Sequence, residues 1–170
     1  TRLESVLTGA AALGGNLVLE FNSGSNRTLT LQNTGAGTAG LTAATRLAES
    51  GARVCVLAKG IGSTHLAPGT VDVLGHAPDP VEEPARALSE LVAARPDHPY
   101  ALMGVESVAP ALQWFAGRIA NGPQPGYRYV GDLERNHLLS TAVGVLRPSA
   151  LVPETMAEGD GRDLVAVAQA

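Results

Sequence analysis

The sequence contains little or none of several features, and each shortage argues against a class of protein. There is a single cysteine, Cys55, so neither an intramolecular disulfide nor a cysteine-based metal cluster can form. No apolar run approaches the roughly 18–20 residues that a membrane-spanning helix needs. The N-terminus lacks the charged region and long apolar segment of a secretory signal. We therefore expect a protein of the reducing cytoplasm, with Cys55 as a small buried residue of a strand.

Aromatic residues and lysine are also scarce. Aromatics make up 4% of the 170 residues against 45% hydrophobic residues, so a core must consist mainly of Ala, Val and Leu. The net charge is −4, and Lys59 is the only lysine beside scattered arginines. Without a basic stripe, nucleic acid is not expected as a partner. The four histidines show no metal-ligand spacing, so no metal site is predicted.

Glycine, in contrast, is abundant and ordered at one place, Gly35-Ala36-Gly37-Thr38-Ala39-Gly40. A helical pattern follows to Gly51, and residues 53–57 are apolar enough for a strand. This Gly-x-Gly-x-x-Gly spacing and its context are typical of a dinucleotide-binding βαβ unit. The first glycine permits a tight turn, the second lets the backbone approach a pyrophosphate, and the third lets helix and strand pack closely. The N-terminus of the helix attracts the negatively charged pyrophosphate through its free N–H groups and the positive end of the helix dipole.

The segment before the glycines does not fit this pattern as well. Leu17, Leu19 and Phe21 alternate with polar residues, as do Leu29 and Leu31, around a polar tip at residues 22–26, which predicts a hairpin. The first strand of a doubly wound sheet is normally a continuous apolar run. We therefore predict two parts, namely an atypical hairpin-like extension of different origin (1–33) and an α/β domain with a parallel sheet (34–170).

Further elements are predicted downstream. Pro84 suits the first turn of a helix that continues to Ala94. The Asp97–Tyr100 stretch ends that helix, and His98 can cap or pack at a helix end. A second helix begins near Ala109, because Pro110 is tolerated only in a first turn. Strands are expected at residues 127–130, 142–146 and 164–168, and the polar stretch 134–137 is interpreted as a solvated turn.

The residues after the second strand leave alternatives open. A carboxylate that binds a ribose hydroxyl usually lies there, but the chain has Lys59-Gly60 instead. Lys59 either interacts electrostatically with a phosphate of the ligand or is a solvated lysine at the end of a strand. Ser63-Thr64-His65 is either a polar loop touching cofactor or substrate, or a plain surface loop. No acid–base set is evident, so no catalytic residue is assigned.

Five blocks of sequence stand out, namely Gly35–Leu41, Val56–Gly60, Ser63–Leu74, His98–Leu102 and Gly144–Ser149. Together they resemble a known family, the B subunit of anaerobic glycerol-3-phosphate dehydrogenase, in the FAD-dependent oxidoreductase class. The glycine turn is generic to flavoproteins, whereas the Ser-x-His loop with its continuation and the His-Pro-Tyr element are more particular. The similarity covers roughly residues 34–155, and the resemblance implies that residues 34–170 are the N-terminal part of a flavin-binding oxidoreductase domain.

The resemblance implies a Rossmann-like core and flavin-dependent oxidation of sn-glycerol 3-phosphate to dihydroxyacetone phosphate, with electrons passed toward membrane quinone. It implies FAD, with FMN as the alternative, and two partners, a catalytic subunit and an iron–sulfur membrane-anchor subunit. It also implies a cytoplasmic protein, peripheral at the inner face of the membrane. The implied cofactor-binding residues are Gly35, Gly37, Thr38, Ala39, Gly40, Lys59, Gly60, Ser63 and His65.

Two other hypotheses stand beside this one. The first is a non-catalytic subunit or interaction module with a Rossmann-like fold, favoured by the missing carboxylate. The second is an NAD(P)-binding protein in which Lys59 or Arg53 lies near a 2′-phosphate.

Overall fold

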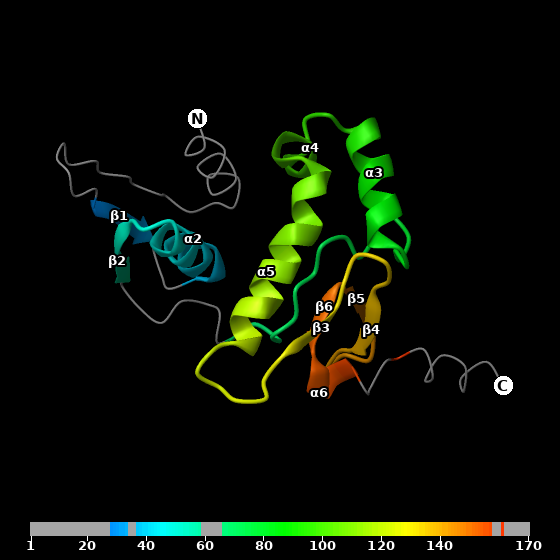
Figure 1. Cartoon of the computed structure of the whole chain (residues 1–170). Helices are drawn as coiled ribbons and strands as arrows, with labels where there is room; N and C mark the ends of the chain where they lie inside the picture. Colours follow the sequence, from blue (N-terminus) through cyan, green and yellow to red (C-terminus); the bar gives the residue numbers. More distant parts are fainter. Residues whose placement is uncertain (1–27, 34–36, 59–65, 158–160, 162–170) are drawn as a thin grey trace. The chain divides into compact units, whose positions relative to one another are not determined.

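The computed structural model describes residues 28–33, 37–58, 66–157 and 161 (Figure 1). It divides into two compact units, Thr1–Pro68 and Gly69–Ala170, and each is described by itself. Most of the predicted hairpin before Thr28, and the strand predicted at 164–168, lie outside the described residues.

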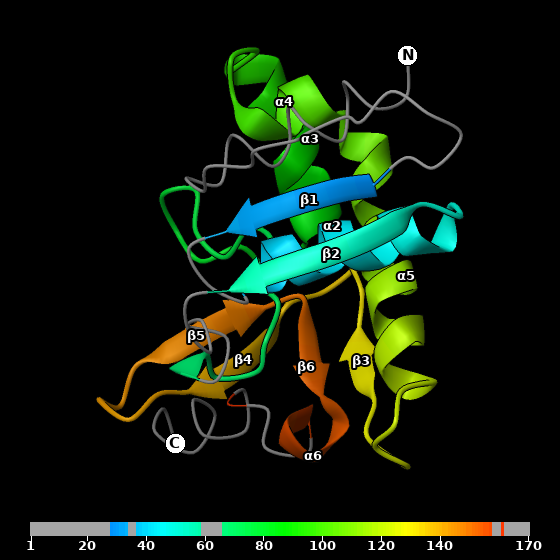
Figure 2. The same ribbon diagram turned by 90° about the vertical axis from the view of Figure 1, so that its left-hand side faces the viewer.

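The described part of the first unit is a β–α–β arrangement. Strand β1 (Thr28–Asn33) leads to helix α2 (Thr38–Glu49) and then to strand β2 (Arg53–Ala58). The two strands are parallel, with Thr28 opposite Arg53 at one end and Asn33 opposite Ala58 at the other. Figure 2 shows them side by side, with α2 along one face of the pair. The alternating segment 28–33 therefore provides the strand that must precede the glycine turn. The larger parallel sheet stays a prediction.

Helix α2 forms where the apolar pattern predicts it. Ala44 is buried and packs with Ala43, Leu47 and Val54. The helix ends beside Gly51, whose φ of +86° is a left-handed conformation that a glycine adopts without steric cost. The predicted helix and its glycine stop are confirmed.

Cys55 is exposed, so the prediction of a buried thiol is wrong. Neighbouring side chains of a strand point to opposite faces, and Val54 already faces α2. Cys55 consequently points to the face that α2 does not cover.

The second unit contains a group of helices that follow the predicted pattern. Pro84 lies in the first turn of α3, and the side chain of His98 caps α4 by accepting a hydrogen bond from the backbone N–H of Tyr100 at 3.2 Å. Pro110 lies in the first turn of α5, where a missing N–H does no harm. The bounds are α3 (Pro84–Ala94), α4 (Pro99–Met103), the 3-10 helix η2 (Val105–Ser107) and α5 (Val108–Ala120).

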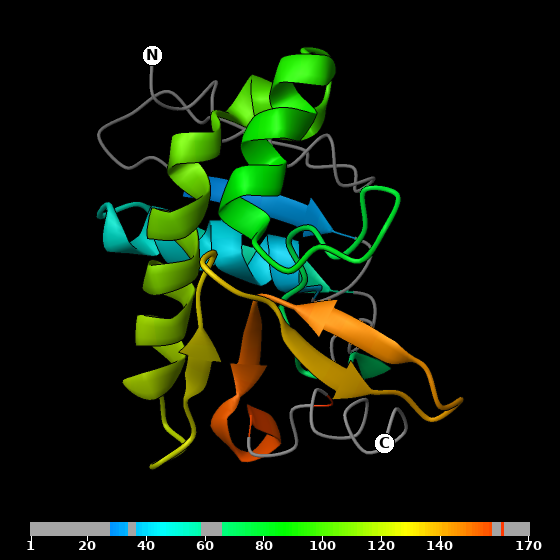
Figure 3. The ribbon, with the colours of Figure 1, turned by 90° about the vertical axis from the view of Figure 1, so that its right-hand side faces the viewer.

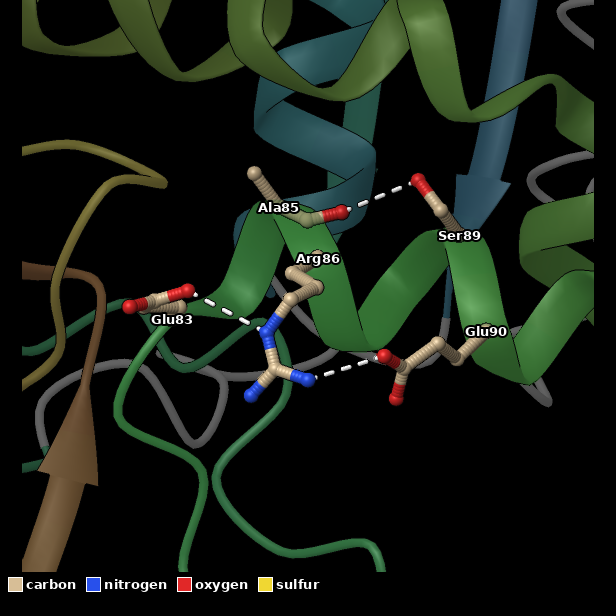
Figure 4. Close-up of polar contacts among 5 residues, drawn as sticks. All are labelled: Glu83, Ala85, Arg86, Ser89 and Glu90. Atoms are coloured by element: carbon tan, nitrogen blue, oxygen red, sulfur yellow. Dashed lines mark hydrogen bonds and ion pairs between the residues drawn. The ribbon is translucent and has the colours of Figure 1, made fainter.

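The outer face of α3 carries a chain of polar contacts (Figure 4). Arg86 lies between Glu83 and Glu90, with N–O distances of 3.2 and 2.9 Å. Both carboxylates raise the pKa of the guanidinium, with the hydrogen bond to Glu83 as the largest cause. Ser89 donates to the carbonyl of Ala85 at 3.1 Å. All these groups are exposed, and exposed ion pairs add little stability.

Two antiparallel pairs of short strands complete the second unit (Figure 3). Strand β3 (Tyr129–Gly131) pairs with β6 (Leu151–Pro153), and β4 (His137–Ser140) pairs with β5 (Leu146–Ser149). A short helix, α6 (Glu154–Ala157), follows.

The strand predicted at 142–146 is misplaced. Residues 141–145 form the turn between β4 and β5, where Gly144 has φ +80° and Thr141 accepts a hydrogen bond from, and donates one to, the backbone of Val145. A positive φ of this kind belongs to a turn rather than to a strand. The 134–137 stretch is likewise not simply a solvated turn, because Asn136 is buried and His137 begins β4.

The core of the second unit lies between the helices and the strands. Leu88 of α3 and Leu112 of α5 pack against Leu133, which lies between β3 and β4, and against Leu151 of β6. Phe115 and Tyr129 pack at the edge of this cluster, with ring centroids 5.3 Å apart in an edge-to-face arrangement.

Candidate functional site

The carboxyl ends of β1 and β2 lie at the same edge of the pair, because the strands are parallel and Asn33 pairs with Ala58. Helix α2 begins after β1 with Gly37 as its N-cap, in an extended conformation (φ −71°, ψ 158°). The backbone N–H of Leu41 donates to the carbonyl of Gly37 at 3.1 Å, which closes the first helical turn. In open α/β sheets, ligands bind at this edge.

The electrostatics of this helix end favour an anion. Within the described ranges no side chain caps α2 through a hydrogen bond, and the first turn of the helix holds no acidic residue. The helix dipole and the N–H groups of the first turn therefore present partial positive charge. A Cβ added at Gly37 would meet nothing within 4 Å, so open space adjoins the backbone there. The geometry fits a phosphate that approaches the backbone closely.

Four of the predicted cofactor-binding residues lie together at this end. Gly37 caps α2, and Thr38, Ala39 and Gly40 form its first turn, with Thr38 and Ala39 exposed. Gly35, Lys59, Gly60, Ser63 and His65 lie outside the described residues, so their roles stay predictions.

Arg53 is at the opposite end of β2 from Ala58. The two residues are five steps apart along the strand, which is roughly 16 Å at ~3.3 Å per residue. Arg53 is thus poorly placed for a 2′-phosphate at the carboxyl edge. The alternative of an NAD(P) site gains no support from this residue.

A second arrangement, in the other unit, centres on residues 69–74, which we call the anchored segment. The hydroxyl of Tyr129 donates to the carbonyl of Gly69, and the backbone of Val71 exchanges hydrogen bonds with Leu151 at 2.9 and 3.1 Å. Tyr100 donates to the carbonyl of Val73 at 2.8 Å. Tertiary contacts hold the anchored segment along its whole length.

Side-chain contacts complete this anchoring at three of its residues. Asp72 accepts hydrogen bonds from Ser149 and, at 3.2 Å, from Thr70. Arg147 donates from Nη2 to Thr70, and its Nε lies 3.5 Å from Asp72 Oδ2. The buried amide of Asn136 donates to the carbonyls of Leu74 and Val81 at 2.9 and 2.8 Å. Two hydroxyls, a carboxylate and a guanidinium form one cluster, which we call the Asp72 cluster (Thr70, Asp72, Arg147 and Ser149).

Burial affects the two tyrosines that hold the anchored segment. It raises the pKa of Tyr100, and it is the main reason why the pKa of Tyr129 rises to about 12, with a further contribution from the neighbouring Tyr127. A neutral phenol is the form that can donate a hydrogen bond to a carbonyl. Both contacts are therefore maintained at neutral pH.

The Asp72 cluster has no counterpart among the site residues that the sequence predicts. Its four residues do, however, belong to two of the blocks that carry the family resemblance, Ser63–Leu74 and Gly144–Ser149. Asp72 and Ser149 are 77 positions apart. The family resemblance of these two blocks is therefore the one sequence feature that points to the cluster, because the spacing of the four residues does not show that they lie close together.

Two further kinds of feature are absent from the described part of the chain. Within the ranges that the structure describes, no three His, Cys, Asp or Glu side chains come together as a metal site would require. None of the helices in those ranges combines the length and the hydrophobicity needed to cross a membrane.

Comparison with known proteins connects these features to a family. A relative from Pectobacterium carotovorum subsp. carotovorum (strain PC1), named as the B subunit of anaerobic glycerol-3-phosphate dehydrogenase, is 36% identical over 121 residues. That alignment covers 70% of this chain and 28% of the relative. Proteins of the same name from Actinobacillus succinogenes and Aliivibrio fischeri are 34% and 32% identical, over 72% and 69% of this chain and 28% and 26% of theirs.

The chain therefore spans little more than a quarter of the length of these relatives. No solved structure is significantly similar to it. The model of the FAD binding domain family matches residues 34–170, which begin immediately after β1 and include the glycine turn. This match supports FAD as the cofactor, with FMN as a minor alternative, and implies a Rossmann-like α/β fold. The chain belongs to the family of FAD-binding domains, and its curated relatives are the B subunits of anaerobic glycerol-3-phosphate dehydrogenases.

Proposed function

We propose that this chain binds FAD at the carboxyl edge of β1 and β2 and takes part in the oxidation of sn-glycerol 3-phosphate to dihydroxyacetone phosphate, with electrons passing toward membrane quinone. The observation that carries the proposal is the order of a strand, a glycine-capped helix and a parallel strand. The match to FAD-binding domains and the names of the relatives support the cofactor and the substrate.

In this proposal the chain itself binds and orients the cofactor. Gly35, Gly37 and Gly40 surround the phosphates, and Thr38 and Ala39 open the helix whose N-terminus faces them. Lys59, Gly60, Ser63 and His65 lie near the cofactor. Bound FAD supplies the acceptor of the electrons removed from the alcohol.

The proposal extends to an assembly. The relatives are named as one subunit of a dehydrogenase, which supports partner subunits for this chain as well. We propose a catalytic partner subunit and an iron–sulfur subunit that anchors the complex, with this chain peripheral at the inner face of the membrane.

Anaerobic reduction of the flavin tests this function. The chain is loaded with FAD and mixed with sn-glycerol 3-phosphate, alone and together with the two partner subunits. The visible flavin band is expected to bleach, with one dihydroxyacetone phosphate formed per flavin reduced, whereas glycerol and sn-glycerol 1-phosphate leave the band unchanged. An FAD-loaded chain that stays oxidised in both mixtures would contradict the substrate assignment.

The same preparation separates the two other hypotheses. Saturable binding of NAD or NADP to a chain that takes up no FAD would support a nicotinamide site. A colourless chain that still assembles with the partner subunits would support a non-catalytic module.

A further inference from the structure

Arg147 differs from the other arginines of the chain that have a described ion pair. Those arginines, including Arg128 and Arg135, keep 59–68% of their side chains exposed. Only 33% of the Arg147 side chain is exposed, and its Nε is fully buried. A guanidinium that is brought this far out of water is held for a structural or a binding purpose.

One edge of the Arg147 guanidinium, formed by Nε and Nη2, faces Thr70 and Asp72. Nη2 donates to Thr70 Oγ1, and Nε faces Asp72 Oδ2 at 3.5 Å. Asp72 is itself held, because its Oδ1 accepts hydrogen bonds from the fully buried Ser149 and from Thr70. The guanidinium of Arg147 is therefore oriented by one hydrogen bond to Thr70 and by an ion-pair contact to a carboxylate that is itself held in place.

The other edge of the guanidinium is not used within the cluster. Among the residues that the structure describes, Nη1 of Arg147 has no hydrogen-bond partner. Nη1 and the second hydrogen of Nη2 form a pair of parallel donors, the geometry that matches two oxygens of a phosphate. Asp72 offsets part of the positive charge of Arg147, so binding of a phosphate here would depend mainly on the two parallel N–H donors rather than on net charge.

We propose that this outer edge of Arg147, positioned by Thr70 and Asp72, binds the phosphate group of a small phosphorylated substrate. The proposal rests on the proposed function, because the relatives are named for a phosphorylated substrate. It assigns substrate recognition to Arg147 and a positioning role to Thr70 and Asp72. Cofactor binding depends on the other unit, so the two functions can be lost separately.

The test is a titration of the full chain with inorganic phosphate, sn-glycerol 3-phosphate and glycerol, followed by ³¹P NMR for the phosphates and by calorimetry for all three. Both phosphates are expected to bind saturably, and glycerol is not. Arg147→Gln is expected to weaken phosphate binding at least tenfold, and Arg147→Lys to weaken it less, because a charge remains without the planar fork. Arg128→Gln, at an exposed arginine paired with Glu154, is the matched control and should bind as the parent does.

Thr70 provides a second pair of variants that keeps the charge intact. Thr70→Val is expected to weaken phosphate binding three- to tenfold, and Thr70→Ser to restore it, because serine keeps the orienting hydroxyl. FAD uptake and thermal unfolding are measured in parallel to show whether each variant is folded. If Arg147→Gln does not fold, the phosphate affinity of a folded, FAD-binding Thr70→Val chain tests the proposal instead. A parent chain that binds neither phosphate, or an Arg147→Gln chain that binds both with parental affinity, overturns the proposal. If FAD uptake fails while phosphate binding depends on Arg147, only the proposed cofactor function falls.

Discussion

Ser149 and Asp72, 77 positions apart in the chain, are joined by a hydrogen bond from the serine hydroxyl to the carboxylate. Ser149 is fully buried on β5, whereas Asp72 lies in the anchored segment and keeps part of its side chain exposed. The contact ties the anchored segment to the β4–β5 pair. Among the described residues, Asp72 is the only partner of the Ser149 hydroxyl, so this buried group depends on the carboxylate.

Ser149→Ala is expected to lower the free energy of unfolding by about 1–3 kcal/mol, because a hydrogen bond to a charged group is lost in a buried position. Denaturant unfolding followed by circular dichroism measures this change. Ser89→Ala is the control, since Ser89 donates to a carbonyl of its own helix at an exposed position (Figure 4). A similar loss in both variants would show that the Ser149 contact has no special weight.

Two glycines with positive φ should respond very differently to alanine. Gly131 has φ +108°, and a Cβ there would overlap the carbonyl oxygen of Ala150 and press on His137. Gly131→Ala is expected to cost roughly 3 kcal/mol or more, because strain and overlap add. Gly144 has φ +80° with nothing near the new atom, so Gly144→Ala should cost only about 1–2 kcal/mol of conformational strain. Equal thermal shifts in the two variants would contradict the close approach of β3 to Ala150.

Leu88 should be the most sensitive position of α3. It is almost fully buried in the core between α3, α5 and the strands. Leu88→Ala is expected to lower the free energy of unfolding by about 2–5 kcal/mol through lost contacts and a cavity. Leu102→Ala, at an exposed leucine of α4, should change it by less than about 0.5 kcal/mol. Urea unfolding of the two variants compares them directly, and a small effect at Leu88 would contradict the described core.

Alkaline pH should weaken the second unit through Tyr129. Its pKa is about 12 in the folded chain, chiefly because of burial, against 10.0 as the ordinary value. Between these values the folded state keeps a proton that the unfolded state has lost. The stability contributed by the neutral phenol is therefore complete below pH 10 and disappears as the pH rises toward 12. Tyr129→Phe should flatten the decline of the unfolding midpoint over this window, and an unchanged slope would show that another group causes it.

The helices could be predicted because local residues determine them. Pro84, the His98–Pro99 cap and the Gly51 stop each act within one or two turns of their own helix. The strand before the glycines was harder to assign, because residues 28–33 alternate like a half-buried strand although they pair in parallel with β2. The position of this strand depends on its pairing with β2, which comes later in the chain, and a local sequence pattern does not reveal such a pairing.

The arrangement around the anchored segment could not be predicted for a related reason. The contacts of Asp72 with Ser149 and of Asn136 with Leu74 join residues more than sixty positions apart. For Cys55, in contrast, the local sequence predicted a burial that the structure does not show. Its apolar neighbours indicate burial, but exposure depends on which face α2 covers. Residue types indicate which groups can interact, and the fold decides which of them meet.

The proposed phosphate-binding site at the Gly37 end of α2 can be examined by titrating the chain and its Gly37→Ala variant with FAD and following the flavin fluorescence. Gly37 has φ −71° and open space around its missing Cβ, so the variant should fold with nearly unchanged stability. The added methyl group would occupy the space where a pyrophosphate approaches the backbone. We predict saturable binding by the parent chain, at least tenfold weaker binding by Gly37→Ala, and parental binding by Gly117→Ala, whose new Cβ also meets nothing within 4 Å. A parent chain that does not bind FAD, or a Gly37→Ala chain that binds it equally well, would show that the phosphates are not held at this helix end.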